Sequence, residues 1–276
     1  MDKSPISEEI YSRQPKSFER GVPIFIDRQN DNYVENYDEI SADHIASVER
    51  GNGNPFIDST TWSDIEQNSI AHGKRYIKPG MTILDVGVGT GRLLSHFPEA
   101  RRYGIDVSIN YAERLLDTGA EIAVGKVEEL PYIDGAFDVV FCTDVLEHVE
   151  NLLLASRELV RVVKPGGILI VRVPYKEDLS LYLQDDYPYR LAHLRNFDEY
   201  SLRLLFERQL GLATAQTDLD YSTAPSRLRL PIPRGKTLLT RIVLAPASKM
   251  PKLAGAVRWF FRPLEITVSF HKADHG

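Results

Sequence analysis

Residues 82–95 read Thr-Ile-Leu-Asp-Val-Gly-Val-Gly-Thr-Gly-Arg-Leu-Leu-Ser and carry the clearest fold signal in the chain. The apolar residues 82–86 predict a buried strand, and a helix is expected at about 91–97. Gly87, Gly89 and Gly91 occupy every second position between this strand and this helix. Glycine lets the backbone turn sharply and lets a ligand approach the main chain at the N-terminus of the following helix. We therefore expect a ligand-binding turn between a strand and a helix.

The ligand class follows from what surrounds this turn. A dinucleotide fingerprint would need glycine where the chain has Arg92, and no Gly-Lys-Ser/Thr phosphate loop is present. Asp106 ends the next predicted strand, about twenty residues after Asp85, where a carboxylate can accept both ribose hydroxyls of an adenosine group. The pattern favours an adenosine-containing ligand over nicotinamide, flavin or a nucleoside triphosphate.

Short apolar strands alternate with helical segments from residue 82 onward, which predicts βαβ units and a doubly wound, mostly parallel α/β sheet. Two amphipathic helices are expected before it, at 34–50 and 62–77, and one short strand at 22–26. The further strands are expected at 102–106, 121–124, 137–143, 167–173, 212–221 and 265–271, and the further helices at 108–118, 151–163 and 197–210.

Several motifs in order resemble the class I methyltransferases that depend on S-adenosylmethionine (SAM), in particular the group typified by ubiquinone-biosynthesis and small-molecule enzymes. The resemblance covers about residues 33–211. It rests on Asp85-Val-Gly-Val-Gly-Thr-Gly91, Gly104-Ile-Asp-Val-Ser108, Glu129-Leu-Pro-Tyr132 with Phe137-Asp-Val-Val140, Asp144-Val-Leu-Glu-His-Val149, and Leu159-Val-Arg-Val-Val-Lys-Pro-Gly-Gly167.

The resemblance implies a Rossmann-like sheet of seven strands, the last antiparallel, with SAM across the carboxyl ends of the first strands and S-adenosylhomocysteine as the product. The glycine turn would wrap the methionine end of SAM, Asp85 would order its ammonium group and Asp106 would hold the ribose. Many relatives have an aspartate where this chain has Lys126, so the adenine contacts are open. The implied cofactor-binding set is Asp85, Gly87, Gly89, Gly91, Asp106, Val107, Lys126, Val127, Glu128 and Thr143.

Methyl transfer needs an acceptor lone pair in line with the methyl group and a place for the acceptor's proton. Thr143 and Asp144 follow the fourth strand of the fold and should face the methyl group. His148, His193 and Asp144 are the candidate catalytic residues, although for each histidine a structural role stays open. No spacing of carboxylates and histidines suggests a metal site, and we predict none.

The chain has 276 residues and a net charge of −6, with one cysteine, Cys142. No secretory signal and no apolar run of membrane-spanning length are visible, so a cytoplasmic location is expected. Residues 221–264 hold nine Lys and Arg and no Asp or Glu, interleaved with apolar residues. This basic insertion is either a solvated surface, or an acceptor lid or membrane-surface patch that would make the protein peripheral to the inner face of the membrane.

We divide the chain into an N-terminal arm and helix (1–60), the SAM-binding core (61–220), the basic insertion (221–264), and a last strand with tail (265–276). The function that fits best is SAM-dependent methyl transfer to a small-molecule or glycan acceptor, on oxygen. The first alternative is an RNA-modifying enzyme, which is disfavoured because the chain outside residues 221–264 is acidic. The second is a SAM-binding regulatory protein without catalysis. The sequence does not define the oligomeric state.

Overall fold

The computed structural model describes residues 9–221 and 263–274. The basic insertion predicted at 221–264 lies almost wholly outside the described residues, so its role stays a prediction. None of the helices that the structure describes is long and apolar enough to cross a membrane.

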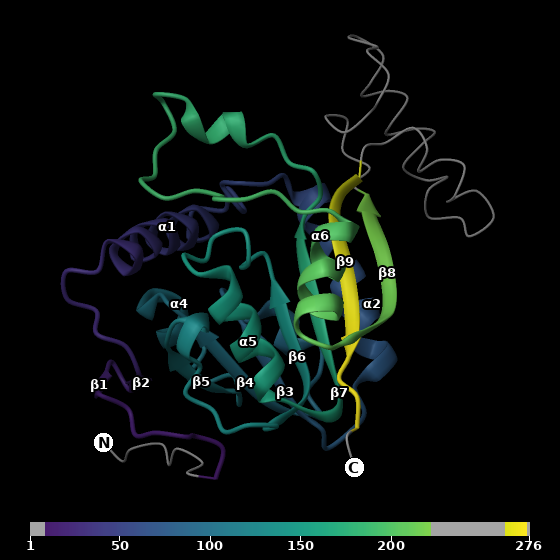
Figure 1. Cartoon of the computed structure of the whole chain (residues 1–276). Helices are drawn as coiled ribbons and strands as arrows, with labels where there is room; N and C mark the ends of the chain where they lie inside the picture. Colours follow the sequence, from purple (N-terminus) through teal and green to yellow (C-terminus); the bar gives the residue numbers. More distant parts are fainter. Residues whose placement is uncertain (1–8, 222–262, 275–276) are drawn as a thin grey trace.

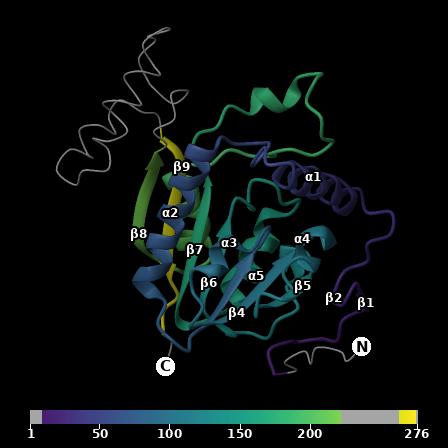
Figure 2. The ribbon, with the colours of Figure 1, turned by 180° about the vertical axis from the view of Figure 1, so that it is seen from behind.

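One mixed sheet organises the chain, with helices on both faces (Figures 1 and 2). Its strand order is β1-β2-β5-β4-β3-β6-β7-β9-β8, and the strands from β2 to β7 in this order are mutually parallel. The predicted doubly wound α/β class is confirmed. The strands are β1 (Ser17–Glu19), β2 (Val22–Ile24), β3 (Thr82–Val86), β4 (Arg101–Asp106), β5 (Glu121–Val124), β6 (Phe137–Thr143), β7 (Val163–Pro174), β8 (Ala213–Tyr221) and β9 (Pro263–His271).

The sheet has nine strands, whereas the resemblance implied seven. The seven expected strands are β3 to β9, and β9 runs antiparallel to both of its neighbours, as expected of the last strand. The two additional strands come from the N-terminal arm, because β2 buries Val22 and Ile24 and joins the sheet edge by pairing Ile24 with Val124. The arm is therefore part of the sheet at this edge.

Helices form a layer on each face of the sheet (Figures 1 and 2). On one face α5 (Leu152–Val162) and α6 (Glu199–Arg203) bury apolar side chains against the sheet, with a π-helical turn at Leu204–Gln209. On the other face lie α2 (Ser59–Tyr76), α3 (Arg92–Ser95) and α4 (Ile109–Glu113). The two apolar clusters on opposite faces show why the central strands are apolar throughout.

Three predicted helices are shorter than expected. The segment expected at 91–97 is helical only in α3, because Pro98 disfavours a helical backbone at the residue before it. The segment at 108–118 is helical only in α4, and that at 197–210 is divided between α6 and the π-helical turn. These differences shorten the elements without changing their order.

Two segments roof the carboxyl ends of the parallel strands. Helix α1 (Asn32–Glu49) crosses above them, and residues 175–198, here called the strap, run over α1 and contain a short helical turn, η2 (Leu179–Leu183) (Figure 1). The strap is bound to α1 by the Tyr189 hydroxyl, which donates to Asp43 at 2.9 Å, and by the Leu191 N–H, which donates to Asn36 at 2.9 Å. The space beneath is enclosed by segments far apart in sequence.

Candidate functional site

The glycine turn after β3 has the backbone that only glycine adopts without strain. Gly87, Gly89 and Gly91 have φ angles of 75°, 49° and 71°. A Cβ atom on Gly87 would lie 2.3 Å from the Cγ2 atom of Val145, so the turn also packs too tightly for a side chain. The main chain at Gly87 and Gly89 therefore stays open toward the space above the strand ends.

Asp106 ends β4 beside this turn and is held by backbone donors. Its carboxylate accepts hydrogen bonds from the N–H groups of Gly89 and Ser108, each at 2.9 Å. Burial raises the pKa of Asp106 to about 6, although these N–H groups oppose the shift. The carboxylate is thus fixed in orientation against the glycine turn.

A cavity of about 640 Å³ lies between the strand ends and the roof of α1 and strap. This volume is in the range of small-molecule and cofactor sites. The predicted residues that line it are Asp85, Gly87, Gly89, Asp106, Val107, Lys126, Val127, Thr143, Asp144, His148 and His193.

Asp85 is a buried carboxylate with an unmet hydrogen-bonding capacity. Its side chain lies at the carboxyl end of β3, and its Oδ1 atom has no hydrogen-bond partner. Burial raises the pKa of Asp85 well above its ordinary value, while the positive charge of Arg172 opposes this. A cationic donor within the cavity would satisfy this carboxylate.

Asp144 is engaged in an ion cluster at the bottom of the cavity. Arg172 on β7 binds both of its carboxylate oxygens and also lies 3.3 Å from a carboxylate oxygen of Glu265. Burial raises and Arg172 lowers the pKa of Asp144, and the net shift is downward. Because Arg172 binds both oxygens of the ionised Asp144 carboxylate, these oxygens are already engaged in the ion pair.

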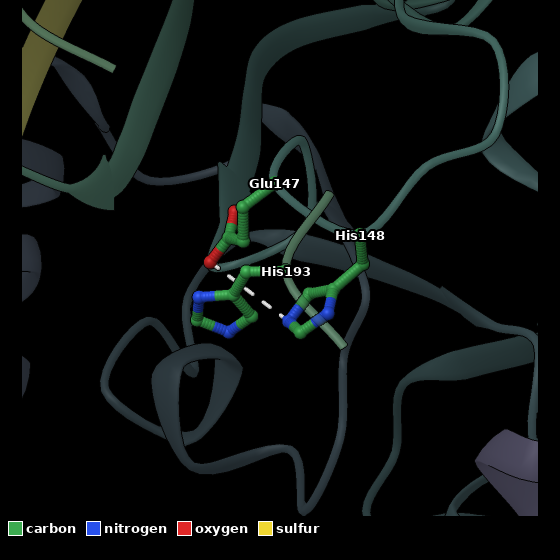
Figure 3. A group of neighbouring side chains, drawn as sticks. All are labelled: Glu147, His148 and His193. Atoms are coloured by element: carbon green, nitrogen blue, oxygen red, sulfur yellow. Dashed lines mark ion pairs between the residues drawn. The ribbon is translucent and has the colours of Figure 1, made fainter. Parts of the chain in front are cut away.

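Two histidines and a glutamate that line the cavity lie close together (Figure 3). The His148 and His193 rings are perpendicular, with centroids 4.4 Å apart, and the Nε2 atom of His148 is 3.9 Å from a carboxylate oxygen of Glu147. Burial, with His193 nearby, lowers the pKa of His148 to about 3. The Nδ1 atom of His193 lies 2.5 Å from the Glu177 carboxylate and 3.0 Å from the Tyr182 hydroxyl.

Comparison with known proteins agrees with this geometry. A sequence model of the methyltransferase domain family matches residues 84–171, which contain the glycine turn, Asp106 and His148. The chain has a class I, SAM-dependent methyltransferase domain. The resemblance and the cofactor expected from the motifs are thereby confirmed for this domain.

Relatives of the methyltransferase domain have diverse names. The chain is 38% identical over 103 residues to 2-methyl-6-phytyl-1,4-hydroquinone methyltransferase of Synechocystis, covering 34% of this chain and 32% of that protein. It is 38% identical over 107 residues to the tRNA (carboxymethyluridine(34)-5-O)-methyltransferase of Arabidopsis thaliana. This match covers 37% of this chain and 26% of that protein. The aligned regions span a third or less of these two relatives.

The fold is shared over a longer stretch. The complex between the Haloferax volcanii Trm112 methyltransferase activator and a methyltransferase contains a chain that matches with a TM-score of 0.60 at 18% identity. The match covers 88% of this chain and 99% of that chain. At this identity the likeness concerns the fold.

Three residues of the predicted cofactor-binding set differ from the rest of that set in their contacts or in their position relative to the cavity. Lys126 lines the cavity, but its ammonium group binds the Asp31 carboxylate at 2.7 Å. Glu128 and Gly91 are not among the cavity-lining residues. Glu128 accepts a hydrogen bond from the Asn151 N–H at 3.3 Å, and Gly91 precedes the first turn of α3.

Sequence reasoning did not identify Glu177, Tyr182 and Arg172 as site residues. Glu177 and Tyr182 lie in the strap, which shows no periodic pattern, and they reach the site only because the strap folds over α1. Arg172 is an arginine inside an apolar strand, and this unusual position could have indicated a buried ion pair.

Proposed function

We propose that this protein transfers the methyl group of SAM to an oxygen atom of a small-molecule or glycan acceptor. The single observation that carries the proposal is the cavity itself. It joins the glycine turn and Asp106 at one end to the His148 and His193 rings at the other, at the carboxyl ends of the parallel strands where α/β sheets bind ligands.

The cofactor end of the cavity matches the groups of SAM. The open main chain at Gly87 and Gly89 would lie along the methionine portion, and Asp106 would accept from the ribose hydroxyls. The unpartnered Oδ1 atom of Asp85 would accept from the ammonium group, directly or through water. The Asp85 oxygen would then be satisfied by a donor that SAM carries.

The acceptor end offers a proton acceptor beside the transfer position. The oxygen lone pair attacks the methyl carbon of SAM, the carbon–sulfur bond breaks with its electron pair left on sulfur, and the hydroxyl proton passes to His193. Glu177 and Tyr182 orient the His193 ring through Nδ1. Asp144 is a poor candidate for this role because Arg172 occupies its carboxylate.

Charge in the cavity disfavours an anionic acceptor. Its three described Lys and Arg side chains, Arg92, Lys126 and Arg172, are each bound to a carboxylate, those of Glu66, Asp31 and Asp144 respectively. No described cation of the cavity is left to receive a phosphate group. This supports a neutral small molecule or sugar ring over RNA, and a role of 221–264 at a membrane surface stays a separate prediction.

Calorimetric titration with SAM tests the cofactor, with NAD as control ligand. We expect SAM and S-adenosylhomocysteine to bind, NAD not to bind, and Asp106→Ala to abolish SAM binding. Asp117→Ala, an exposed aspartate, is the matched control and should bind as the unaltered protein does. Absence of SAM binding by the unaltered protein, or preference for NAD, contradicts the proposal.

Methyl transfer is tested separately, by incubating SAM carrying a labelled methyl group with cell extracts. Transfer to oxygen is supported if the labelled product is small and resists nuclease, and if the label stays bound in alkali, as it does in a methyl ether. Label removed by nuclease would favour the RNA-modifying alternative. SAM binding without any labelled product would favour the regulatory alternative.

A further inference from the structure

We propose that Glu147, His148 and His193 form a binding site for a divalent metal ion. One ligand-type atom from each of the three side chains lies within 4.8 Å of the others, and among the described residues they are the only such group of three (Figure 3). Glu147 and His148 follow β6, whereas His193 comes from the strap, 45 residues later. The sequence therefore gave no metal-ligand spacing, and the fold brings the set together.

The unmet polar atoms of this group point to a cation. Glu147 is 1% exposed, and neither of its carboxylate oxygens has a hydrogen-bond partner. The Nδ1 atom of the half-buried His148 ring is itself buried and also has none. A buried carboxylate without a partner is costly. A bound divalent ion would remove this cost.

The surroundings of His193 are those of a metal-bound histidine. Such a ring usually donates its second N–H to a carboxylate, which fixes the tautomer and leaves the other nitrogen free for the metal. Glu177 provides this carboxylate at 2.5 Å from Nδ1, and Tyr182 in turn donates to Glu177 at 2.7 Å. Glu177 is then a positioning residue for the ligand His193.

Two imidazoles and one carboxylate suit a first-row divalent ion such as Zn²⁺ or Co²⁺ better than Mg²⁺ or Ca²⁺, which prefer oxygen ligands. Three protein ligands leave a coordination position open for an acceptor hydroxyl, whose pKa the ion would lower. The proton would then go to solvent water, and the resulting oxygen would attack the methyl carbon while the carbon–sulfur bond breaks. His193 would be a ligand instead of a base. This role rests on the proposed function, whereas ion binding does not.

Binding is tested without SAM or acceptor, on tag-free full-length protein stripped with chelator. Titration with Co²⁺ is followed by visible absorption, and Zn²⁺ is followed by equilibrium dialysis. We expect one ion per chain and no comparable binding of Mg²⁺. Glu147→Gln and His193→Gln should each weaken binding by about 100-fold or more, and Glu177→Gln by about 10- to 100-fold. His96→Gln, an exposed histidine, is the control and should bind normally.

The outcomes separate this site from the proposed function. SAM titration of each variant shows that it is folded, because Glu147→Gln and His193→Gln leave the glycine turn and Asp106 in place. No stoichiometric Co²⁺ or Zn²⁺ binding by the unaltered protein, or binding unchanged in both ligand variants, overturns the metal site and leaves His193 as the base. Loss of SAM binding by the unaltered protein would overturn the proposed function and not the metal site.

Discussion

Lys126 and Asp31 join the sheet to the helix that roofs the cavity. The Lys126 ammonium lies 2.7 Å from the Asp31 carboxylate, and Asp31 also accepts the N–H groups of Tyr33 and Val34 at the start of α1. The same ammonium lies 5.0 Å from the centre of the Tyr33 ring. Lys126 thus holds the first turn of α1 over the cofactor end of the cavity.

Removing this ion pair should weaken SAM binding. We expect Lys126→Ala to raise the Kd for SAM roughly fivefold, about 1 kcal/mol, because α1 loses its attachment above the cavity. Asp31→Asn keeps a helix-capping side chain and removes the charge, so it should have a similar effect, and the double variant should be no worse than either single one. Calorimetry measures all three.

The control for this comparison of single and double variants is Lys164→Ala. Lys164 lies 2.9 Å from Asp138 in an ion pair that is also partly exposed, but neither residue lines the cavity. Its loss should leave the Kd for SAM unchanged. Additive effects of Lys126→Ala and Asp31→Asn would show that the pair does not act as a unit.

A second prediction concerns the tight packing of the glycine turn. Gly87→Ala combines a left-handed φ angle with a clash against Val145, so we expect it to lower the free energy of unfolding by about 2–5 kcal/mol. Gly166→Ala is the matched control, since Gly166 also has a φ angle of 75° but no atom within 4 Å of the added Cβ. It should cost only about 1–2 kcal/mol.

The clash can be tested apart from the backbone strain. Val145→Ala removes the atom that a Cβ on Gly87 would meet, so adding it to Gly87→Ala should recover part of the lost stability. Urea unfolding of the unaltered protein, the three single variants and the double variant gives the comparison. Equal costs for the two glycine variants, with no recovery in the double variant, would contradict the packing argument.

How much of this could be read from the sequence depends on the distance over which each contact acts. The glycine turn, Asp106 and the parallel strands follow from local patterns, because a strand, a tight turn and a helix start are specified by neighbouring residues. The antiparallel direction of the last strand was implied only by the family resemblance. The N-terminal strands were incompletely predicted, since β2 is only three residues long and is fixed by its partner β5.

The acceptor end could be predicted only in part. His148 belongs to a recognisable motif, but its partner His193 lies in the strap, whose course depends on hydrogen bonds to α1. The pairing of Lys126 with Asp31 spans 95 residues and likewise has no local signal. Burial decides whether a carboxylate such as Glu147 is paired, neutral or a ligand, and burial is a property of the assembled fold.

The half-buried His148 ring predicts a pH dependence of stability. Its pKa is lowered from the ordinary value of 6.5 to about 3 in the folded protein, chiefly by burial. Between these values the unfolded chain binds a proton that the folded protein does not, so its contribution to stability is complete above pH 6.5 and is lost as the pH falls. The slope from this one group reaches at most about 1.4 kcal/mol per pH unit.

The measurement compares urea unfolding of the unaltered protein and of His148→Gln from pH 7.5 to pH 5, in buffer with chelator. The difference in unfolding free energy should change with pH below 6.5, in the direction of a relatively more stable variant at low pH. His271→Gln, at the exposed end of β9, should run parallel to the unaltered protein. Parallel profiles for His148→Gln as well would show that the ring has the same pKa in the folded and unfolded protein, and would contradict the prediction.

The Asp144 and Arg172 pair predicts that Asp144 acts mainly through stability. Arg172 binds Asp144 and Ser69 and lies beside Glu265, so Arg172→Gln leaves the buried Glu265 and the partly exposed Asp144 without their cation. We expect this variant to lose about 3–5 kcal/mol of unfolding free energy. Asp144→Asn should lose less, because Glu265 still balances the arginine, and Arg203→Gln, an exposed control, should lose no more than about 0.5 kcal/mol.

The double variant decides between a structural and a catalytic Asp144. If the aspartate serves the ion pair, Asp144→Asn combined with Arg172→Gln removes an unpaired charge, and the double variant should be more stable than Arg172→Gln alone. Urea unfolding at pH 7 measures this coupling. A proton-accepting Asp144 would instead give an Asp144→Asn protein of unaltered stability that binds SAM but releases no methyl group, because only the transfer step would need its carboxylate.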